Sequence, residues 1–230
     1  MTLDGIESVI SSKYYSGKSW KSRNPKKVNF LRYADDFIVT ADSEETAKEI
    51  MELIELFLKE RGLELSEEKT LITHIDEGFD FLGWNFRKHN GKLLIKPSRK
   101  SIDNVTRKIS DTIKSGKAWP QKNLIDALNP IITGWTNYHQ SVFSKDIFSK
   151  LDYRVWNMLW RWAKRRHPKK SRSWIVKKYW HSEGTRNWVF STEKTKLKLF
   201  SDTKIVIHTR LKLSGTVGKV VKSIQFVTGS

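Results

Sequence analysis

Two adjacent carboxylates, Asp35 and Asp36, are the side chains of this sequence best placed to do chemistry. They lie within KVNFLRYADDFIVTA, where apolar runs on both sides of a polar turn predict a β-hairpin. A tight turn between two strands fixes neighbouring carboxylates in space, and carboxylate oxygens are ligands that Mg²⁺ prefers. The chemistry that this arrangement favours is metal-assisted phosphoryl or nucleotidyl transfer. The alternative is that Asp-Asp only favours the turn itself.

An amphipathic helix is predicted directly after the hairpin. Asp42 and Glu45 form a capping-box pattern at its start, and Gly62 lies where a C-terminal cap is expected. Between them, apolar residues recur at helical spacing: Ala47, Ile50, Met51, Ile54, Phe57 and Leu58. Short strands and turns are expected from 63 to 95, with Asn90-Gly91 as a hairpin turn.

Helices are predicted after Pro97. One carries Ile102, Val105, Ile109 and Ile113 on a single face. Asn129-Pro130 is interpreted as the cap and first turn of a second helix. A third helix is predicted from about Asp146 to Arg166, and its inward-facing residues are expected to be Ile147, Phe148, Leu151, Val155, Leu159 and Trp162. Strand-like segments, WVF and KIVIH, return within 187–227.

The charge of the chain is strongly basic and unevenly distributed. The formal net charge is +18, but residues 1–80 carry −6 and residues 81–230 carry +24. Such a charge indicates a polyanionic partner, and nucleic acid before a membrane surface. The absence of cysteine excludes disulfides, Cys-type zinc sites and thiol catalysis. No apolar run has the length of a membrane span, so no membrane partner is expected.

The charge is densest between Tyr153 and Ser182, a stretch without any acidic residue. Phosphate contacts from such a surface give salt-sensitive binding, and exposed aromatic rings stack on unpaired bases, which makes RNA the expected partner. KRRHPKKSR is expected to be exposed, with Pro168 ending the helix. Five tryptophans lie among these cations: Trp156, Trp160, Trp162, Trp174 and Trp180. Trp162 is assigned to packing, as is Trp135 outside this stretch, and the others are candidates for stacking on bases. The predicted RNA-binding residues are Arg161, Lys164, Arg165, Arg166, Lys169, Lys170, Arg172, Lys177 and Lys178.

Three motifs of the first part resemble the reverse transcriptases of group II introns. They are Tyr33-Ala34-Asp35-Asp36, the segment GLELSEEKT from Gly62 to Thr70, and Phe81-Leu82-Gly83-Trp84. The resemblance implies that Asp35 is the principal metal ligand and that Asp36 assists it. It also implies that Lys69 faces the triphosphate or pyrophosphate, with a solvated surface lysine as the alternative. Phe81, Leu82, Gly83 and Trp84 would position the primer end, with a role in the core as the alternative.

The second part is similar to the maturase-specific thumb of the same family, called domain X. LNPII followed by GWTNY carries the resemblance, and RNWVF with the segment from Leu199 to His208 resembles the C-terminal extension of that thumb. The resemblance extends from residue 1 to about 210. It implies that the partner is group II intron RNA, which the protein binds and helps to splice.

Some features of the family are not found in the sequence. The family's palm has a further catalytic aspartate well upstream, whereas Asp4 and Glu7 are the only acids before Tyr33. We therefore expect that this chain alone lacks the fingers and is not a competent polymerase. Mg²⁺ would act only if a separate chain completed the site; otherwise the site would be a degenerate remnant. Scattered histidines and the missing cysteines predict no endonuclease.

The sequence as a whole predicts an α+β fold in three parts. Residues 1–97 form a partial palm, 98–182 a helical basic thumb, and 183–230 a short extension containing strands. The expected function is that of a maturase that binds intron RNA, in a ribonucleoprotein of a bacterial cytoplasm or an organelle. Two alternatives stay open: RNA-directed DNA synthesis with a completing chain, and a generic nucleic-acid-binding module.

Overall fold

The computed structural model describes residues 4–15, 24–66, 70–184, 186–206, 219–224 and 226–228. The chain forms two compact units. Unit 1 consists of residues 1–79, 86–93 and 210–230, and unit 2 consists of residues 80–85 and 94–209. Helices and small antiparallel sheets occur together, so the predicted α+β class is confirmed. Among the helices within these ranges, none is long and apolar enough to cross a membrane.

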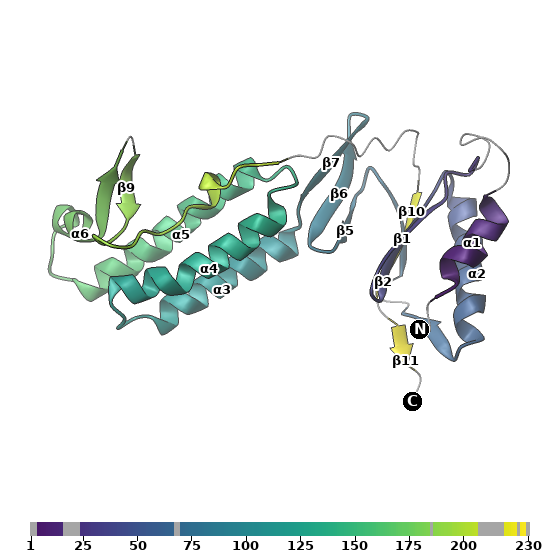
Figure 1. Ribbon diagram of the computed structural model, residues 1–230, viewed down its shortest axis with the longest axis horizontal. Coiled ribbons are helices and arrows are strands. Elements are labelled where there is room, and N and C mark those ends of the chain that lie inside the picture. The colour runs from purple at the N-terminus through teal and green to yellow at the C-terminus, as the bar shows by residue number, and fades with distance from the viewer. Residues whose placement is uncertain are drawn as a thin grey trace. The chain divides into compact units, whose positions relative to one another are not determined.

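Unit 1 is built on a four-stranded sheet and two helices that pack together (Figure 1). The strand order is β1-β2-β10-β4, and β10 runs antiparallel to both of its neighbours. The apolar core lies between the sheet and helix α2, where Phe37, Val39, Ile50 and Ile54 are buried together. The elements are α1 (Ile6–Tyr14), β1 (Asn29–Tyr33), β2 (Asp36–Ala41), α2 (Glu44–Lys59), β3 (Leu63–Leu65), β4 (Leu71–His74), β10 (Lys219–Ile224) and β11 (Phe226–Thr228).

The start of α2 differs from the prediction by one residue. Ser43, and not Asp42, is the N-cap: its hydroxyl accepts a hydrogen bond from the backbone N–H of Thr46. Asp42 remains tied to the end of the hairpin, since its backbone N–H donates to Lys26 O over 2.9 Å. At the other end of the helix, Gly62 has a φ of 68°, as expected for a residue that terminates a helix.

A three-stranded sheet of order β5-β6-β7 follows, and its residues are divided between the two units. Its strands are β5 (Phe79–Phe81), β6 (Trp84–His89) and β7 (Lys92–Pro97). The predicted Asn90-Gly91 turn is confirmed between β6 and β7, with φ angles of 47° and 77°. Two consecutive left-handed residues are what a tight hairpin turn requires.

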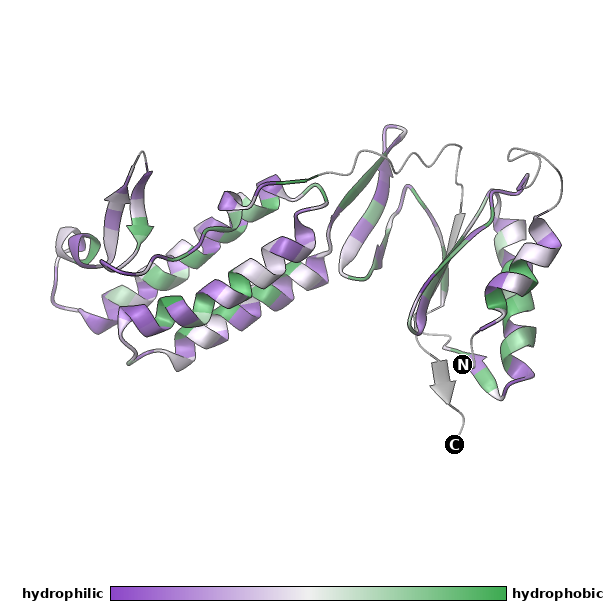
Figure 2. Cartoon of the chain, viewed as in Figure 1, coloured by the Kyte–Doolittle hydropathy of each residue, from purple (hydrophilic) through white to green (hydrophobic). Residues whose placement is uncertain are grey.

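Unit 2 is a bundle of three long helices, in which α3 packs against both α4 and α5 (Figure 1). Hydrophobic and hydrophilic residues follow one another along each helix in Figure 2. The apolar residues recur at helical spacing, so they gather on the side of the helix that faces the core. The inward residues predicted for α5 are confirmed, with Phe148, Leu151 and Leu159 almost fully buried. The helices are α3 (Arg99–Ser115), α4 (Gln121–His139) and α5 (Lys145–Arg166).

The predicted helix start at Asn129-Pro130 is wrong, because both residues lie inside α4. The helix begins eight positions earlier, where Leu124, Ile125 and Leu128 enter the core. Pro130 removes one backbone N–H from the helix ladder. The Asn129 side chain is not a cap: it donates to Lys196 O and accepts from Lys198 N, over 2.9 and 2.8 Å. Its amide therefore holds a segment nearly seventy residues away.

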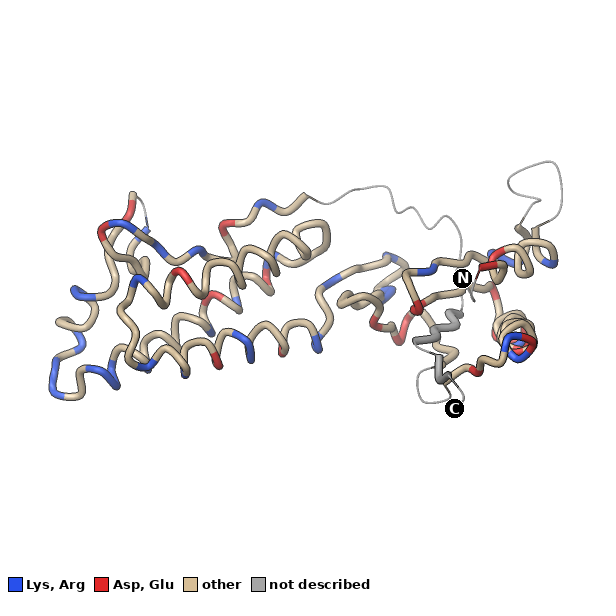
Figure 3. The backbone as a smooth tube through the Cα atoms, turned by 60° about the horizontal axis from the view of Figure 1, so that its bottom comes forward, with Lys and Arg blue, Asp and Glu red and all other residues tan. Residues whose placement is uncertain are grey.

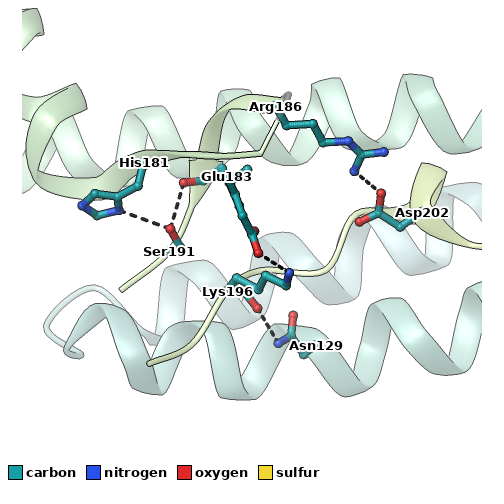
Figure 4. Close-up of polar contacts among 8 residues, drawn as sticks. Asn129, His181, Glu183, Arg186, Ser191, Lys196 and Asp202 are labelled. Atoms are coloured by element: carbon teal, nitrogen blue, oxygen red, sulfur yellow. Dashed lines mark hydrogen bonds and ion pairs between the residues drawn. The ribbon is translucent and has the colours of Figure 1, made fainter. Parts of the chain in front are cut away.

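The remainder of unit 2 consists of α6 (Arg172–Tyr179), the hairpin of β8 (Trp180–Glu183) and β9 (Arg186–Phe190), and the short helix η1 (Phe200–Asp202). The strand predicted at WVF is confirmed. Residues 204–206 of KIVIH form no strand, and the rest of that segment lies outside the described residues. Polar contacts hold the hairpin to the segment that follows it (Figure 4): Glu183 pairs with Lys196 over 2.5 Å, and Arg186 pairs with Asp202. The hydrogen bond from Asn129 to Lys196 O holds that segment to α4.

Candidate functional site

The Asp35-Asp36 pair lies at the tip of the hairpin that the sequence predicts. Strand register pairs Tyr33 with Asp36, which leaves Ala34 and Asp35 as a two-residue turn. Ala34 has a φ of 53°, a conformation that costs a residue with a Cβ about 1–2 kcal/mol. Phe37, Ile38 and Val39 are buried directly behind the turn and anchor it. The two carboxylates are thus presented on a rigid support, with Asp35 exposed and Asp36 half-buried.

The described residues around the carboxylate pair do not form a complete site for a magnesium ion. Among the described residues there is no group of three or more His, Cys, Asp or Glu side chains that could hold a metal ion. Asp4 is engaged elsewhere, since Arg32 lies 3.0 Å from it and the hydrogen bond from this guanidinium lowers the pKa of the carboxyl. Lys69 lies outside the described residues. Because Mg²⁺ takes about six ligands, these residues do not complete a site, and no catalytic step is assigned to a metal here.

The Phe81–Trp84 motif forms a sharp turn between β5 and β6. Leu82 and Gly83 are both left-handed, with φ angles of 48° and 78°. Phe81 is a core residue, only 3% exposed, whereas the three residues after it are half-buried. Phe81 therefore packs in the core, whereas Leu82, Gly83 and Trp84 form the half-buried part of the turn.

Helix α4 of unit 2 holds this turn through two hydrogen bonds and a ring contact, and the start of α3 adds a third hydrogen bond. The Tyr138 hydroxyl donates to Leu82 O over 2.6 Å, and the Tyr138 ring stacks on Trp84 at 5.2 Å. The Trp84 indole N–H donates to Nδ1 of His139 over 3.0 Å. The backbone N–H of Ser98, the N-cap of α3, donates to Gly83 O over 2.8 Å. Sequence reasoning did not assign Tyr138 or His139 to this turn, although Tyr138 belongs to the GWTNY motif.

His139 is a neutral histidine with one defined tautomer. Its side chain is buried, and burial lowers its pKa to about 4. Since an indole N–H can only donate, Nδ1 must be the unprotonated nitrogen, and Nε2 carries the proton toward Ser101 Oγ at 3.0 Å. Ser101 Oγ also accepts from the Trp135 indole over 3.0 Å. A continuous chain of hydrogen bonds thus connects the turn to the interior of the bundle.

The predicted RNA-binding residues of unit 2 are brought together around the end of α5, the loop after it and α6. Figure 3 shows Lys and Arg concentrated along this turn of the chain. Eight of the nine residues are exposed, and Arg166 is half-buried. Arg166 donates to Lys117 O and Trp119 O over 2.7 and 3.0 Å, so its side chain is held in place.

The tryptophans between these cations are mostly structural, which corrects the stacking role considered for them. Trp162 and Trp180 are buried at 5% and 3% exposure, and Trp162 donates to Gly116 O. Trp156 and Trp160 stack on each other and pack against the core. Trp174 is half-buried, and Lys170 and Lys178 already lie over its ring. The assignment of Trp162 and Trp135 to packing is confirmed.

Comparison with protein families identifies both parts of the chain. Residues 5–86 match the family described as reverse transcriptase (RNA-dependent DNA polymerase), and residues 102–180 match the group II intron maturase-specific domain. The hairpin around Asp35 thus lies in the segment that matches reverse transcriptases, and most of the helical bundle lies in the segment that matches the maturase-specific domain. The resemblance to the group II intron reverse transcriptase/maturase family, deduced from the motifs, is confirmed.

Individual relatives agree with this assignment. The chain is 37% identical over 91 residues to the group II intron-encoded protein LtrA of Lactococcus lactis, a match that covers 36% of this chain and 15% of that protein. It is 32% identical over 132 residues to the ribosomal operon-associated A protein of Euglena longa, covering 54% and 24% of the two chains. Maturase-like protein 1 of the same organism is 28% identical over 117 residues, covering 49% and 25%. The chain thus spans a quarter or less of the length of these relatives.

Proposed function

We propose that this chain binds group II intron RNA through the basic surface of unit 2 and assists the splicing of that RNA. The observation that carries the proposal is the exposed, acid-free set of cations within the segment that matches the maturase-specific domain. RNA that is stabilised in its active fold splices by its own chemistry, so this role needs no complete protein active site. In this role the chain acts inside the cell or organelle that transcribes the intron, as part of a ribonucleoprotein.

The test is in vitro splicing of the group II intron that flanks the reading frame, at a Mg²⁺ concentration too low for self-splicing. Spliced exons are expected only with the full chain, and Lys169→Ala/Lys170→Ala should reduce their yield. Lys26→Ala/Lys59→Ala removes the same charge from exposed positions of unit 1 and should leave the yield unchanged. Unchanged splicing upon addition of the chain contradicts the proposal. Equal binding to the intron and to unrelated RNA supports a generic nucleic-acid-binding module instead.

A second candidate function, RNA-directed DNA synthesis, is favoured by the presentation of Asp35 and Asp36 at the tip of the hairpin. In this function the pair would contribute to a Mg²⁺ site that another polypeptide segment or chain completes, and the turn from Leu82 to Trp84 would position the primer end. Primer extension on an RNA template, with the wild-type chain and with Asp35→Ala, is the test. We expect no extension by the chain alone. Extension that is lost in Asp35→Ala would establish the polymerase in this chain.

A further inference from the structure

A pocket of about 360 Å³ lies between α3 and α5 of unit 2. Two of its lining residues, Ile113 and Trp162, are buried core residues, and Met158 packs beside them, so its floor is apolar. The remaining lining residues are polar or basic: Ser110, Lys114, Lys117, Arg161, Arg165 and Arg166. The volume is in the range of sites for small organic ligands, and it is larger than a phosphate group alone needs.

The five cations around this pocket are not equivalent. Arg166 is held by two backbone carbonyl groups and by the Trp162 ring, 4.7 Å from its guanidinium. Lys114 pairs with Asp111 over 3.3 Å. Arg161 and Arg165, in contrast, are exposed one helical turn apart on α5, and no ion pair engages them among the described residues. The pocket therefore has a positively charged rim with two guanidinium groups available to an anion.

We propose that this pocket binds one unstacked nucleotide of an RNA strand. Its phosphate lies against Arg161 and Arg165, because guanidinium groups bind phosphate in a bidentate fashion. Its base lies over the apolar floor at Met158 and Trp162. Ser110 offers a hydroxyl group at the pocket edge that can hydrogen-bond to the base or the 2′-OH. The proposal rests on the proposed function, since it names the site at which the basic surface recognises the RNA.

An RNA loop or single strand fits the pocket better than a duplex does. A phosphate-binding rim alone would suit either ligand, but an apolar floor below the rim stabilises only a group that can leave the helical stack. Trp156 and Trp160 stack on each other and Trp180 is buried, so they are not available to a base, whereas Trp162 lines this pocket within the basic surface.

The test is binding of a short single-stranded oligoribonucleotide and of an RNA duplex of the same composition to the full chain, by fluorescence anisotropy. Arg161→Ala/Arg165→Ala should weaken binding of the single strand about tenfold or more, which corresponds to the loss of charge-assisted contacts. Lys100→Ala/Lys108→Ala removes two exposed lysines of α3 outside the pocket. This control should change the affinity for the single strand by less than about threefold. Ser110→Phe fills the pocket without changing the charge, and should weaken binding of the single strand selectively.

Each outcome separates the pocket from the proposed function. If Ser110→Phe, folded by circular dichroism, binds the single strand as the wild type does, the pocket proposal is wrong while RNA binding stands. The pocket proposal is also wrong if Arg161→Ala/Arg165→Ala and Ser110→Phe each lose as much affinity for the duplex as for the single strand, because such losses indicate diffuse electrostatic binding. Met158→Ala, which enlarges the floor, provides a second charge-neutral variant if Ser110→Phe does not fold. A wild-type chain that binds neither RNA contradicts the proposed function itself.

Discussion

The indole N–H of Trp84 donates to Nδ1 of His139 over 3.0 Å, and this contact connects the turn after β5 to helix α4. It also requires His139 to be neutral, because a proton on Nδ1 would face a group that can only donate. One of the contacts between this turn and the helix bundle of unit 2 thus depends on the protonation state of His139.

Acid should weaken unit 2 through His139. The folded-state pKa of about 4 lies below the ordinary value of 6.5, so the unfolded chain binds more protons between these values. The contribution of His139 is complete above pH 6.5 and is lost as the pH falls toward 4, on the order of 3 kcal/mol in total. Urea unfolding at pH 7 and pH 4.5 measures this loss.

His139→Gln is the matched variant for this measurement, because an amide keeps one acceptor and one donor but does not titrate in this range. It should be less stable at pH 7 and show a flatter dependence on pH than the wild type. His89→Gln, at an exposed position, should leave the dependence unchanged. An equally steep loss of stability in His139→Gln would show that another group is responsible.

Removal of the Tyr138 hydroxyl should loosen the turn without unfolding the bundle. Tyr138→Phe keeps the ring against Trp84 but leaves Leu82 O without its donor at 2.6 Å. The expected cost is about 1 kcal/mol. Faster amide hydrogen exchange at residues 82–84, with unchanged exchange in α5, is the expected pattern. Uniformly faster exchange throughout unit 2 would contradict a local role.

Ala34→Gly should stabilise the hairpin that carries Asp35 and Asp36. Glycine removes the left-handed penalty of about 1–2 kcal/mol, and the greater entropy of the unfolded chain offsets about half of it. We expect a net gain of about 0.5–1 kcal/mol in the free energy of unfolding of unit 1. Ala118→Gly, where φ is not positive, serves as the control and should not stabilise. A loss of stability in Ala34→Gly would contradict the strain assigned to this turn.

Asp152 should be important for the attachment of the segment around η1. Its two carboxylate oxygens accept from the backbone N–H groups of Phe200 and Ser201, over 2.7 and 3.0 Å. Asp152→Ala leaves both donors without this acceptor and should cost about 2–3 kcal/mol. Limited proteolysis should then cut near Phe200 first. Asp146→Ala, at an exposed site in the first turn of α5, should cost less than about 1 kcal/mol.

Burial raises the pKa of Asp152, against the effect of these hydrogen bonds. The folded state therefore holds the proton more tightly than the unfolded chain does, and this titration by itself lowers stability as the pH rises through that range. Asp152→Asn should remove this dependence while keeping one acceptor. Its pH profile distinguishes the titration of Asp152 from that of His139, since the two effects have opposite signs.

Local patterns predicted the elements of this chain well, and long-range contacts account for the errors. The hairpin around Asp35, the apolar face of α2 and the extent of α5 all depend on neighbours within a few positions. Asn129-Pro130 was misread because Asn129 bonds to residues 196 and 198, which no local pattern reveals. The three-part division at residues 97 and 182, and the roles of the site residues, stay predictions.

The sequence by itself determined the family and the turn that presents Asp35 and Asp36, because these depend on residue types at fixed short spacings. It also determined the opposite net charges of the two parts, which depend on composition alone. Only the tertiary structure decided which tryptophans are exposed, since periodicity does not show which side of a helix its neighbours cover. It also decided that β10 lies between β2 and β4, and that Trp84 meets His139. Strand order and side-chain partners follow from packing between distant segments.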